Sequence, residues 1–245
     1  MRHERPPRSG DRPDDAIRIE LVPKSYGGSR SLIHLGYRDR RRYEAAVAAV
    51  IPAIERALTR GVVANRARLA PWGIELEPWR LARRRYVRSL RAASNGPSRA
   101  AFVGDVRDCY GSITPATVER ALHVAGASSG HVERIAALLH SFELRGVRGL
   151  PIGPPPSAVL ANAVLAPVDD ALGEAAEGPA YRWVDDVVVF TRNAAAGRRT
   201  AAAFDRALEA FGLSANAQKC TIVEDPSMLL PKASRSSYLG PRDMA

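Results

Sequence analysis

The stretch AYRWVDDVVVF at residues 180–190 contains two apolar runs on either side of the adjacent acids Asp185 and Asp186. Short runs rich in valine and aromatic residues, separated by turn-forming residues, predict a strand, a tight turn and a second strand. Acids are favoured at turns because their side chains bond the local backbone, so a purely turn-forming role stays open. Two adjacent acids followed by four apolar residues are less usual, and they also indicate a candidate catalytic site.

A third acid, Asp105, ends another predicted strand, AFVGDV at 101–106. If the strands are neighbours, their carboxylates repel, and a like-charge pair at about 4 Å costs about 4 kcal/mol at an effective dielectric near 20. Divalent cations remove this cost, and Mg²⁺ typically takes one or two carboxylates together with substrate phosphates. Two such ions can hold the attacking and leaving oxygens of a phosphoryl transfer. The acids Asp105, Asp185 and Asp186 therefore form a candidate site for two Mg²⁺ ions, with Mn²⁺ as a substitute.

The rest of the chain alternates between strand and helix patterns. Residues 17–23 and 30–35 flank a glycine turn and predict a β-hairpin. Apolar residues recur at helical spacing from Asp39 to about Arg60, where Pro52 is expected to kink or divide the helix. Further helices are predicted at 78–92, from Thr114 onward, at 130–142, at 157–172 and at 196–211, with a last strand at 220–224. This order predicts an α+β domain with an antiparallel sheet flanked by helices.

The chain is strongly basic, with 36 Lys and Arg against 26 Asp and Glu, a net charge of +10 and a pI of about 10.3. A surplus of this size predicts a polyanionic partner, with nucleic acid first and an anionic membrane surface second. The hydrophobic fraction of 46% is ordinary for a globular protein and excludes a wholly disordered chain.

Targeting signals are not visible in the sequence. Residues 1–15 are rich in Pro, Arg and Asp and predict a disordered basic tail, not a secretory signal. No run approaches the 18 or more apolar residues of a membrane span, so no membrane partner is expected. The two cysteines make neither a disulfide framework nor a zinc cluster, which fits a reducing cytoplasm.

One predicted helix, PWRLARRRYVRSLRA at 78–92, concentrates positive charge and interleaves it with aromatic residues. Such a run is often only a solvated helix face. Because the charge is nearly all of one sign, a surface that tracks phosphates is at least as good an interpretation. The candidate nucleic-acid-binding residues are Arg80, Arg83, Arg84, Arg85 and Arg88.

Six stretches, taken in order, resemble the reverse transcriptases, which are built on the right-hand polymerase palm. They are VPKSYGGSRSLI (22–33, fingers hairpin), FVGDVRDCYGSI (102–113, motif A), LPIGPPPSAVLAN (150–162, motif B), YRWVDDVVVF (181–190, motif C), NAQKC (216–220, motif D) and SSYLG (236–240, motif E). Trp183 stands in place of the usual motif C tyrosine and Ile152 in place of a frequent motif B glutamine. The Leu-Pro-Ile-Gly form is more similar to bacterial retron-type and abortive-infection-type enzymes than to retroviral ones.

The resemblance implies roles for individual residues. It implies that Asp105 and Asp185 hold the metals, with Asp186 beside them, and that Lys219 lies near the departing pyrophosphate. It also implies that Tyr110 lies under the sugar of the incoming nucleotide and excludes a 2′-hydroxyl, although a core aromatic is a competing interpretation. The other residues implied to contact the nucleotide are Lys24 and Arg30, through their charges, Asp108 and Cys109, through their backbone amides, and Gly153.

The resemblance also implies a fold made of fingers, expected at 16–100, and a palm, expected at 101–245. Family members usually continue into a helical thumb after motif E, so the thumb is expected to be missing here. A partner protein or a second copy of the chain is one way to supply a thumb-like function.

The implied function is RNA-directed DNA synthesis, with dNTPs as substrates and an RNA template and DNA primer as partners. The expected setting is the bacterial cytoplasm, with phage defence as its role. Two alternatives stay open. One is template-independent or protein-primed DNA synthesis, and the other is a palm-like subunit that binds nucleic acid without catalysis.

Overall fold

A computed structural model describes residues 16–23 and 28–230 of the chain. The tail predicted at 1–15, the candidate residue Lys24 and the stretch at 236–240 lie outside the described residues. Their predicted structures and roles therefore stay predictions.

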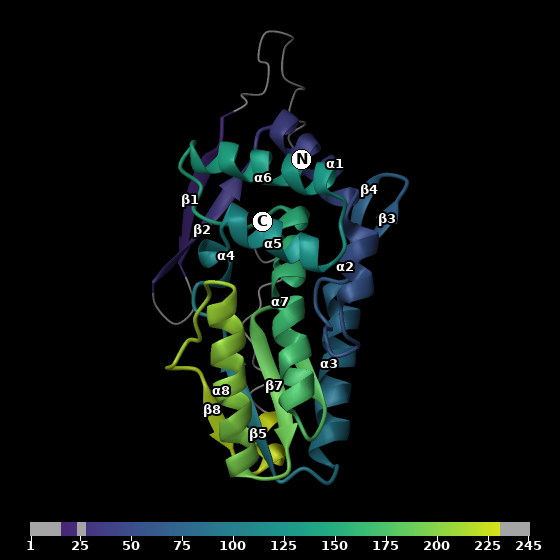
Figure 1. The fold of residues 1–245 in the computed structure, drawn as a ribbon, viewed down its shortest axis with the longest axis vertical. Helices are drawn as coiled ribbons and strands as arrows, with labels where there is room; N and C mark the ends of the chain where they lie inside the picture. The colour runs from purple at the N-terminus through teal and green to yellow at the C-terminus, as the bar shows by residue number, and fades with distance from the viewer. Residues whose placement is uncertain (1–15, 24–27, 231–245) are drawn as a thin grey trace, which may run out of the picture.

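A four-stranded antiparallel sheet carries the candidate site (Figure 1). Its strands lie in the order β6-β7-β5-β8, and their bounds are Ala180–Trp183 for β6, Asp186–Thr191 for β7, Ala100–Asp105 for β5 and Thr221–Val223 for β8. The register places Asp105 directly opposite Asp186 at one end of the sheet. The strand, turn and strand predicted around the adjacent acids is therefore confirmed, and Asp105 lies on the neighbouring strand.

The sheet is buried on both faces because its strands alternate apolar side chains between two cores. Phe102 and Val189 pack with residues of helices α7 (Pro155–Ala175) and α8 (Ala194–Ala210). Ala101 and Phe190, each one position away, pack with residues of helix α3 (Trp79–Ser94). Two helices thus cover one face and one helix covers the other, which confirms the predicted α+β class.

The remaining helices gather at the end of the molecule beyond the sheet (Figure 1). They are α1 (Tyr37–Ala48), α2 (Ile51–Ala57), the short α4 (Cys109–Ser112), α5 (Pro115–Val124) and α6 (Ser129–Glu143). Pro52 lies in the first turn of α2, where its missing N–H costs nothing, and it divides the predicted 39–60 helix as expected. Thr114 caps α5 by accepting a hydrogen bond from the N–H of Thr117 at 3.2 Å.

Two small hairpins complete the described fold. Strands β1 (Arg18–Pro23) and β2 (Ser29–His34) form the hairpin predicted near the N-terminus, and β3 (Ala67–Ala70) pairs with β4 (Gly73–Leu76). The N–H of Ile33 donates to the carbonyl of Ile152 at 2.9 Å. This bond fastens the first hairpin to the loop at 150–154.

The main hydrophobic core is one cluster of buried residues, whose members range in the sequence from Ile33 to Leu213. It therefore includes residues from both of the units predicted at 16–100 and 101–245. Helix α7 lies at its centre and is buried along most of its length. Among the described helices, none is both long and apolar enough to cross a lipid bilayer.

Candidate active site

A two-residue connection, Val184-Asp185, joins β6 to β7 at the end of the sheet. Val184 has φ = +58°, a left-handed conformation in which a β-branched residue is a genuine outlier. Backbone strain of this kind persists only where the surroundings impose it, and it is frequent at active sites. The guanidinium of Arg182 donates to the carbonyl of Val184 at 2.8 Å and is part of those surroundings.

The carboxylate of Asp105 is almost fully buried, with 3% of the residue exposed, and both of its oxygens accept hydrogen bonds. The amide nitrogen of Asn216 donates to one oxygen at 2.9 Å. The ammonium of Lys219 donates to the other at 2.6 Å. The structure therefore brings Lys219 to the candidate metal ligand itself. Its predicted place beside a departing pyrophosphate stays a prediction.

The three acids are held close enough to disfavour one another's charge. Burial, and next the carboxylate of Asp105, raise the pKa of Asp185. Burial, then the charges of Asp185 and Asp105, raise the pKa of Asp186 to about 7. Burial opposes the charge of Lys219, but its hydrogen bond and charge interaction with Asp105 raise the pKa of this lysine overall. A single ammonium thus offsets only part of the repulsion among three carboxylates.

The donor set fits a hard divalent cation. Among the residues that the structure describes, no group of three His, Cys, Asp or Glu side chains is arranged as a ready-made metal cage. Mg²⁺ seldom needs one, because it is usually held by one or two carboxylates plus substrate phosphates and water. Asp105 and Asp185 would supply those carboxylates, with Asp186 as the third acid. The ammonium of Lys219 lies where it would have to give way.

The short helix α4, which follows β5, carries Tyr110, which is half-buried and packs against both hydrophobic cores. Its carbonyl accepts a hydrogen bond from the N–H of Leu150 at 2.9 Å. At Gly149 (φ = +67°) an added Cβ would lie 2.2 Å from that same carbonyl, so only glycine allows this approach. The start of the motif B loop is therefore packed and hydrogen-bonded against the backbone of Tyr110.

The structure also places the other described residues that the resemblance assigns to the nucleotide. Asp108 has a left-handed backbone (φ = 43°), precedes α4 and makes an exposed ion pair with Arg148 at 3.4 Å. Cys109 is buried, and burial first raises the pKa of its thiol, so a nucleophilic role is disfavoured. Gly153 has φ = +126° and lies in the loop that bonds to the first hairpin.

Arg30 lies on β2, near enough to Asp185 for its charge to act on that carboxyl. Its positive charge acts to lower the pKa of Asp185, although burial and Asp105 outweigh it. Of the two predicted phosphate-binding residues, the structure thus places Arg30 within reach of the charge of Asp185, while Lys24 lies outside the described residues.

The predicted basic helix is α3, and its arginines divide between two faces. An open groove of about 380 Å³ is lined by Arg83, Arg84, Val87, Arg88 and Arg91. The guanidinium of Arg83 lies over the ring of Trp183, 5.3 Å from its centre, and the charge of Asp186 acts to raise the pKa of Arg83 against a larger lowering by burial. One end of the groove therefore adjoins the hairpin that carries Asp185 and Asp186.

Two of the predicted nucleic-acid-binding arginines do not line this groove. Arg85 makes a two-pronged ion pair with Glu77, at 2.6 and 2.7 Å, and also donates to the carbonyl of Val63. Arg80 lies on the exposed face with its guanidinium 5.7 Å from the ring centre of Trp79.

Sequence reasoning missed Asn216, Arg182 and Asn162 as residues that support the site. Arg182 had a visible signal, since it is a charged residue within an otherwise apolar strand. Asn162 interrupts the apolar run of α7 in the same way. Nothing in the sequence marks Asn216 apart from its place in motif D.

The family model for reverse transcriptase (RNA-dependent DNA polymerase) matches residues 22–242, which is most of the chain. The chain belongs to the reverse transcriptase family. The resemblance to reverse transcriptases is thereby confirmed at the level of the family.

Solved reverse transcriptase structures share the fold. The apo telomerase of Candida tropicalis, truncated from its C-terminal domain, superposes with a TM-score of 0.58 at 14% sequence identity. That match covers 85% of this chain and 50% of the telomerase chain. A second apo telomerase structure from the same organism gives a TM-score of 0.56 at 12% identity, covering 90% of this chain and 46% of that one. This reverse transcriptase chain thus spans about half the length of those telomerases. Among curated proteins no significant match was found.

Reverse transcriptases generally depend on divalent metal, and the raised pKa of Asp186 gives a pH test of the site. An ordinary aspartate has a pKa of about 3.9, so the folded chain binds more protons than the unfolded chain between pH 4 and about 7. The stability that protonated Asp186 contributes is therefore complete below pH 4 and is lost as pH rises through 7. Metal binding relieves the repulsion left above that pH. We expect the rise in melting temperature on adding Mg²⁺ to be larger at pH 8 than at pH 6.

The matched control is Asp186→Asn, which removes the titrating group. Its metal-free melting temperature should change less between pH 6 and pH 8 than that of the wild type. An unchanged slope in this variant would assign the pH dependence to other groups, with Asp185 the first candidate.

Proposed function

We propose that this chain extends a DNA strand from dNTPs by two-metal nucleotidyl transfer, copying an RNA template. The observation that carries the proposal is the register of the palm sheet, which places Asp105 opposite Asp186 and beside the strained turn bearing Asp185. A subunit that only binds nucleic acid has no need to bury three mutually repelling acids. Their arrangement therefore favours catalysis over the non-catalytic alternative.

Each residue has a role that its position supports. Bound divalent cations would supply activation of the primer 3′-hydroxyl and stabilisation of the leaving pyrophosphate. Asp105 and Asp185 hold the site, and Asp186 adds negative charge beside it. Lys219, once released from Asp105, carries its proton and charge toward the leaving group. Arg30 approaches the triphosphate from the first hairpin, where a guanidinium pairs well with phosphate oxygens.

The nucleic acid is assigned to the arginine groove of α3. The groove residues Arg83, Arg84, Arg88 and Arg91 repeat at about one helical turn along one side of the helix, so a phosphate backbone can follow them. Because Arg83 contacts Trp183 of the catalytic hairpin, the groove leads directly away from the acids. Arg80 extends the same exposed face.

The decisive experiment is an incorporation assay with Mg²⁺ and labelled dNTPs, run with and without an RNA template, followed by sequencing of the product. Template-complementary product supports the proposal. Product of unrelated sequence without template would replace it by template-independent synthesis, and labelled protein would indicate protein priming. Absence of product in every arm, with tight RNA binding, would favour the non-catalytic alternative.

Sugar selection gives a further prediction, at Tyr110. A ring there acts by exclusion of the 2′-hydroxyl, so shrinking it relaxes discrimination without removing a metal ligand. Tyr110→Ala should lower the ratio of kcat/KM for dGTP over GTP, while Tyr110→Phe should leave it nearly unchanged. An unchanged ratio in the alanine variant would make Tyr110 a core aromatic only, consistent with its packing against both cores.

A further inference from the structure

Arg182 places a full positive charge in the interior of the protein, with only 2% of the residue exposed. It occupies the middle of β6, two residues before the strained Val184. Burying a guanidinium is costly unless its donors are satisfied. Its hydrogen-bond partners therefore indicate what the residue does.

The first partner is Asp169 on α7. The Nε and Nη2 atoms of Arg182 donate to its carboxylate at 2.8 to 3.0 Å, forming a two-pronged pair. Burial raises the pKa of Asp169, while the charge of Arg182 and its hydrogen bonds act to lower it. This pair fixes the plane of the guanidinium against the central helix.

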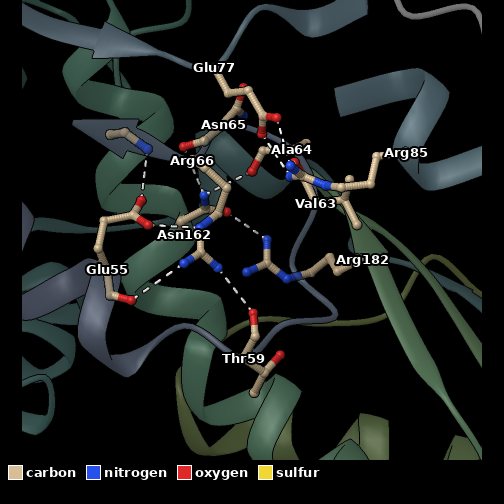
Figure 2. A network of polar contacts seen from close by, with 11 residues as sticks. Glu55, Thr59, Val63, Ala64, Asn65, Arg66, Glu77, Arg85, Asn162 and Arg182 are labelled. Carbon is tan, nitrogen blue, oxygen red and sulfur yellow. Dashed lines mark hydrogen bonds and ion pairs between the residues drawn. The ribbon is translucent and has the colours of Figure 1, made fainter. Parts of the chain in front are cut away.

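The remaining guanidinium nitrogen, Nη1, donates hydrogen bonds to two further groups. The Nη1 atom donates to the side-chain oxygen of Asn162, also on α7, at 2.8 Å and to the carbonyl of Val184 at 2.8 Å. Figure 2 shows Arg182 pointing toward Asn162 within a wider polar network. The amide nitrogen of Asn162 donates in turn to the carbonyls of Ala64 and Asn65.

The backbone of Arg182 is held as well. Its N–H donates to the carbonyl of Gly61 at 2.9 Å, and its carbonyl accepts from the N–H of Val63 at 3.1 Å. The residue is thus fixed by α7 and by the segment at 61–65. Its one side-chain contact toward the active site is the bond to Val184, whose carbonyl precedes Asp185.

We propose that Arg182 is a positioning residue, which holds the Val184-Asp185 turn in its strained conformation and so sets the place of the Asp185 carboxylate for metal binding. The inference rests on the proposed function, because it assumes that Asp185 is a metal ligand. Partners that orient a metal ligand usually contribute 10- to 100-fold to metal affinity or activity.

The primary variant is Arg182→Lys. It keeps the positive charge beside Asp169, but its ammonium lacks the planar set of donors that bonds Asp169, Asn162 and Val184 at once. We expect Mn²⁺ affinity, measured on the full chain by electron paramagnetic resonance, to weaken about 10- to 100-fold. In the incorporation assay kcat should fall while KM for dNTP stays near the wild-type value.

The matched control is Arg66→Lys. Arg66 lies in the same network (Figure 2), where it pairs with Glu55 at 2.7 Å and donates to the carbonyl of Thr59 at 3.0 Å. It does not contact the turn through any of these bonds. This variant should lose stability without losing Mn²⁺ affinity. Equal losses of Mn²⁺ affinity in the two lysine variants would overturn the proposal.

A second variant separates positioning from stability in case Arg182→Lys does not fold. Replacing a buried ion pair by apolar residues of similar volume is often neutral or stabilising, so Arg182→Met with Asp169→Leu should lower the melting temperature less than Arg182→Met alone, which leaves Asp169 buried without its partner. The donor to Val184 is still absent, and Mn²⁺ affinity should still fall 10-fold or more. Wild-type Mn²⁺ affinity in the folded double variant would overturn the proposal. Failure of the wild-type chain to bind Mn²⁺ would instead overturn the metal site of the proposed function.

Discussion

Asp185→Asn is expected to lower dNTP incorporation about a thousandfold and, at the same time, to raise the melting temperature. The activity falls because about 4 kcal/mol of transition-state stabilisation is lost with the metal ligand, and each 1.36 kcal/mol is worth a factor of ten. The stability rises because burial and the nearby Asp105 carboxylate disfavour the charge of Asp185, as its raised pKa indicates. A neutral residue of the same shape removes that cost.

The opposite signs of the two effects distinguish loss of chemistry from loss of fold. Asp105→Asn should abolish incorporation equally but without the gain in melting temperature, since it removes the ion pair with Lys219. Asp205→Asn, at an exposed acid on α8, should change neither quantity. Near wild-type incorporation in the Asp185 or Asp105 variant would exclude these acids as metal ligands.

Binding to nucleic acid is expected to weaken about 500-fold between 50 and 200 mM salt. Five phosphates neutralised by Arg80 and the four groove arginines give a log–log slope of about −4.5. The double variant Arg84→Ala with Arg88→Ala should bring the slope to about −2.7. Fluorescence anisotropy of a labelled RNA–DNA duplex, titrated with protein across a salt series, measures this slope.

Two arginines serve as controls for this slope. Arg206→Ala, on the exposed face of α8, should leave the slope unchanged. Arg85→Ala should lower the melting temperature but leave the slope nearly unchanged, because the guanidinium of Arg85 is already bonded to Glu77 and to the carbonyl of Val63. A flat salt titration of the wild type would remove the electrostatic role assigned to α3.

Much of the local structure follows from the sequence. The alternation around Asp185 and Asp186 predicts the hairpin, Pro52 divides its helix, and Thr114 caps the next one. These features depend on interactions within a few residues, which a sequence pattern records directly. The family motifs add the order of the acids along the chain.

The spatial relations could not be read in the same way. The contact between Lys219 and Asp105 joins residues 114 positions apart, and the strand order that creates it is a property of the whole sheet. The adjacent residues Arg84 and Arg85 look equivalent in sequence, yet α3 turns one into the groove and the other toward Glu77. Arg182 could be noticed, but two of its three side-chain partners, Asp169 and Asn162, lie on α7 and cannot be read from the strand itself.

The position of β5 inside the sheet has a consequence for protein synthesis. Both of its neighbours, β7 at 186–191 and β8 at 221–223, leave the ribosome after it. During translation both edges of the strand that ends in Asp105 therefore stay unpaired until these later strands have been made. Unpaired strand edges of growing chains promote aggregation. The acids and Lys219 meet only when nearly all of the described chain has been made. A nascent chain thus completes its candidate active site late, and a chaperone is most useful before that point, while both edges of β5 are still unpaired.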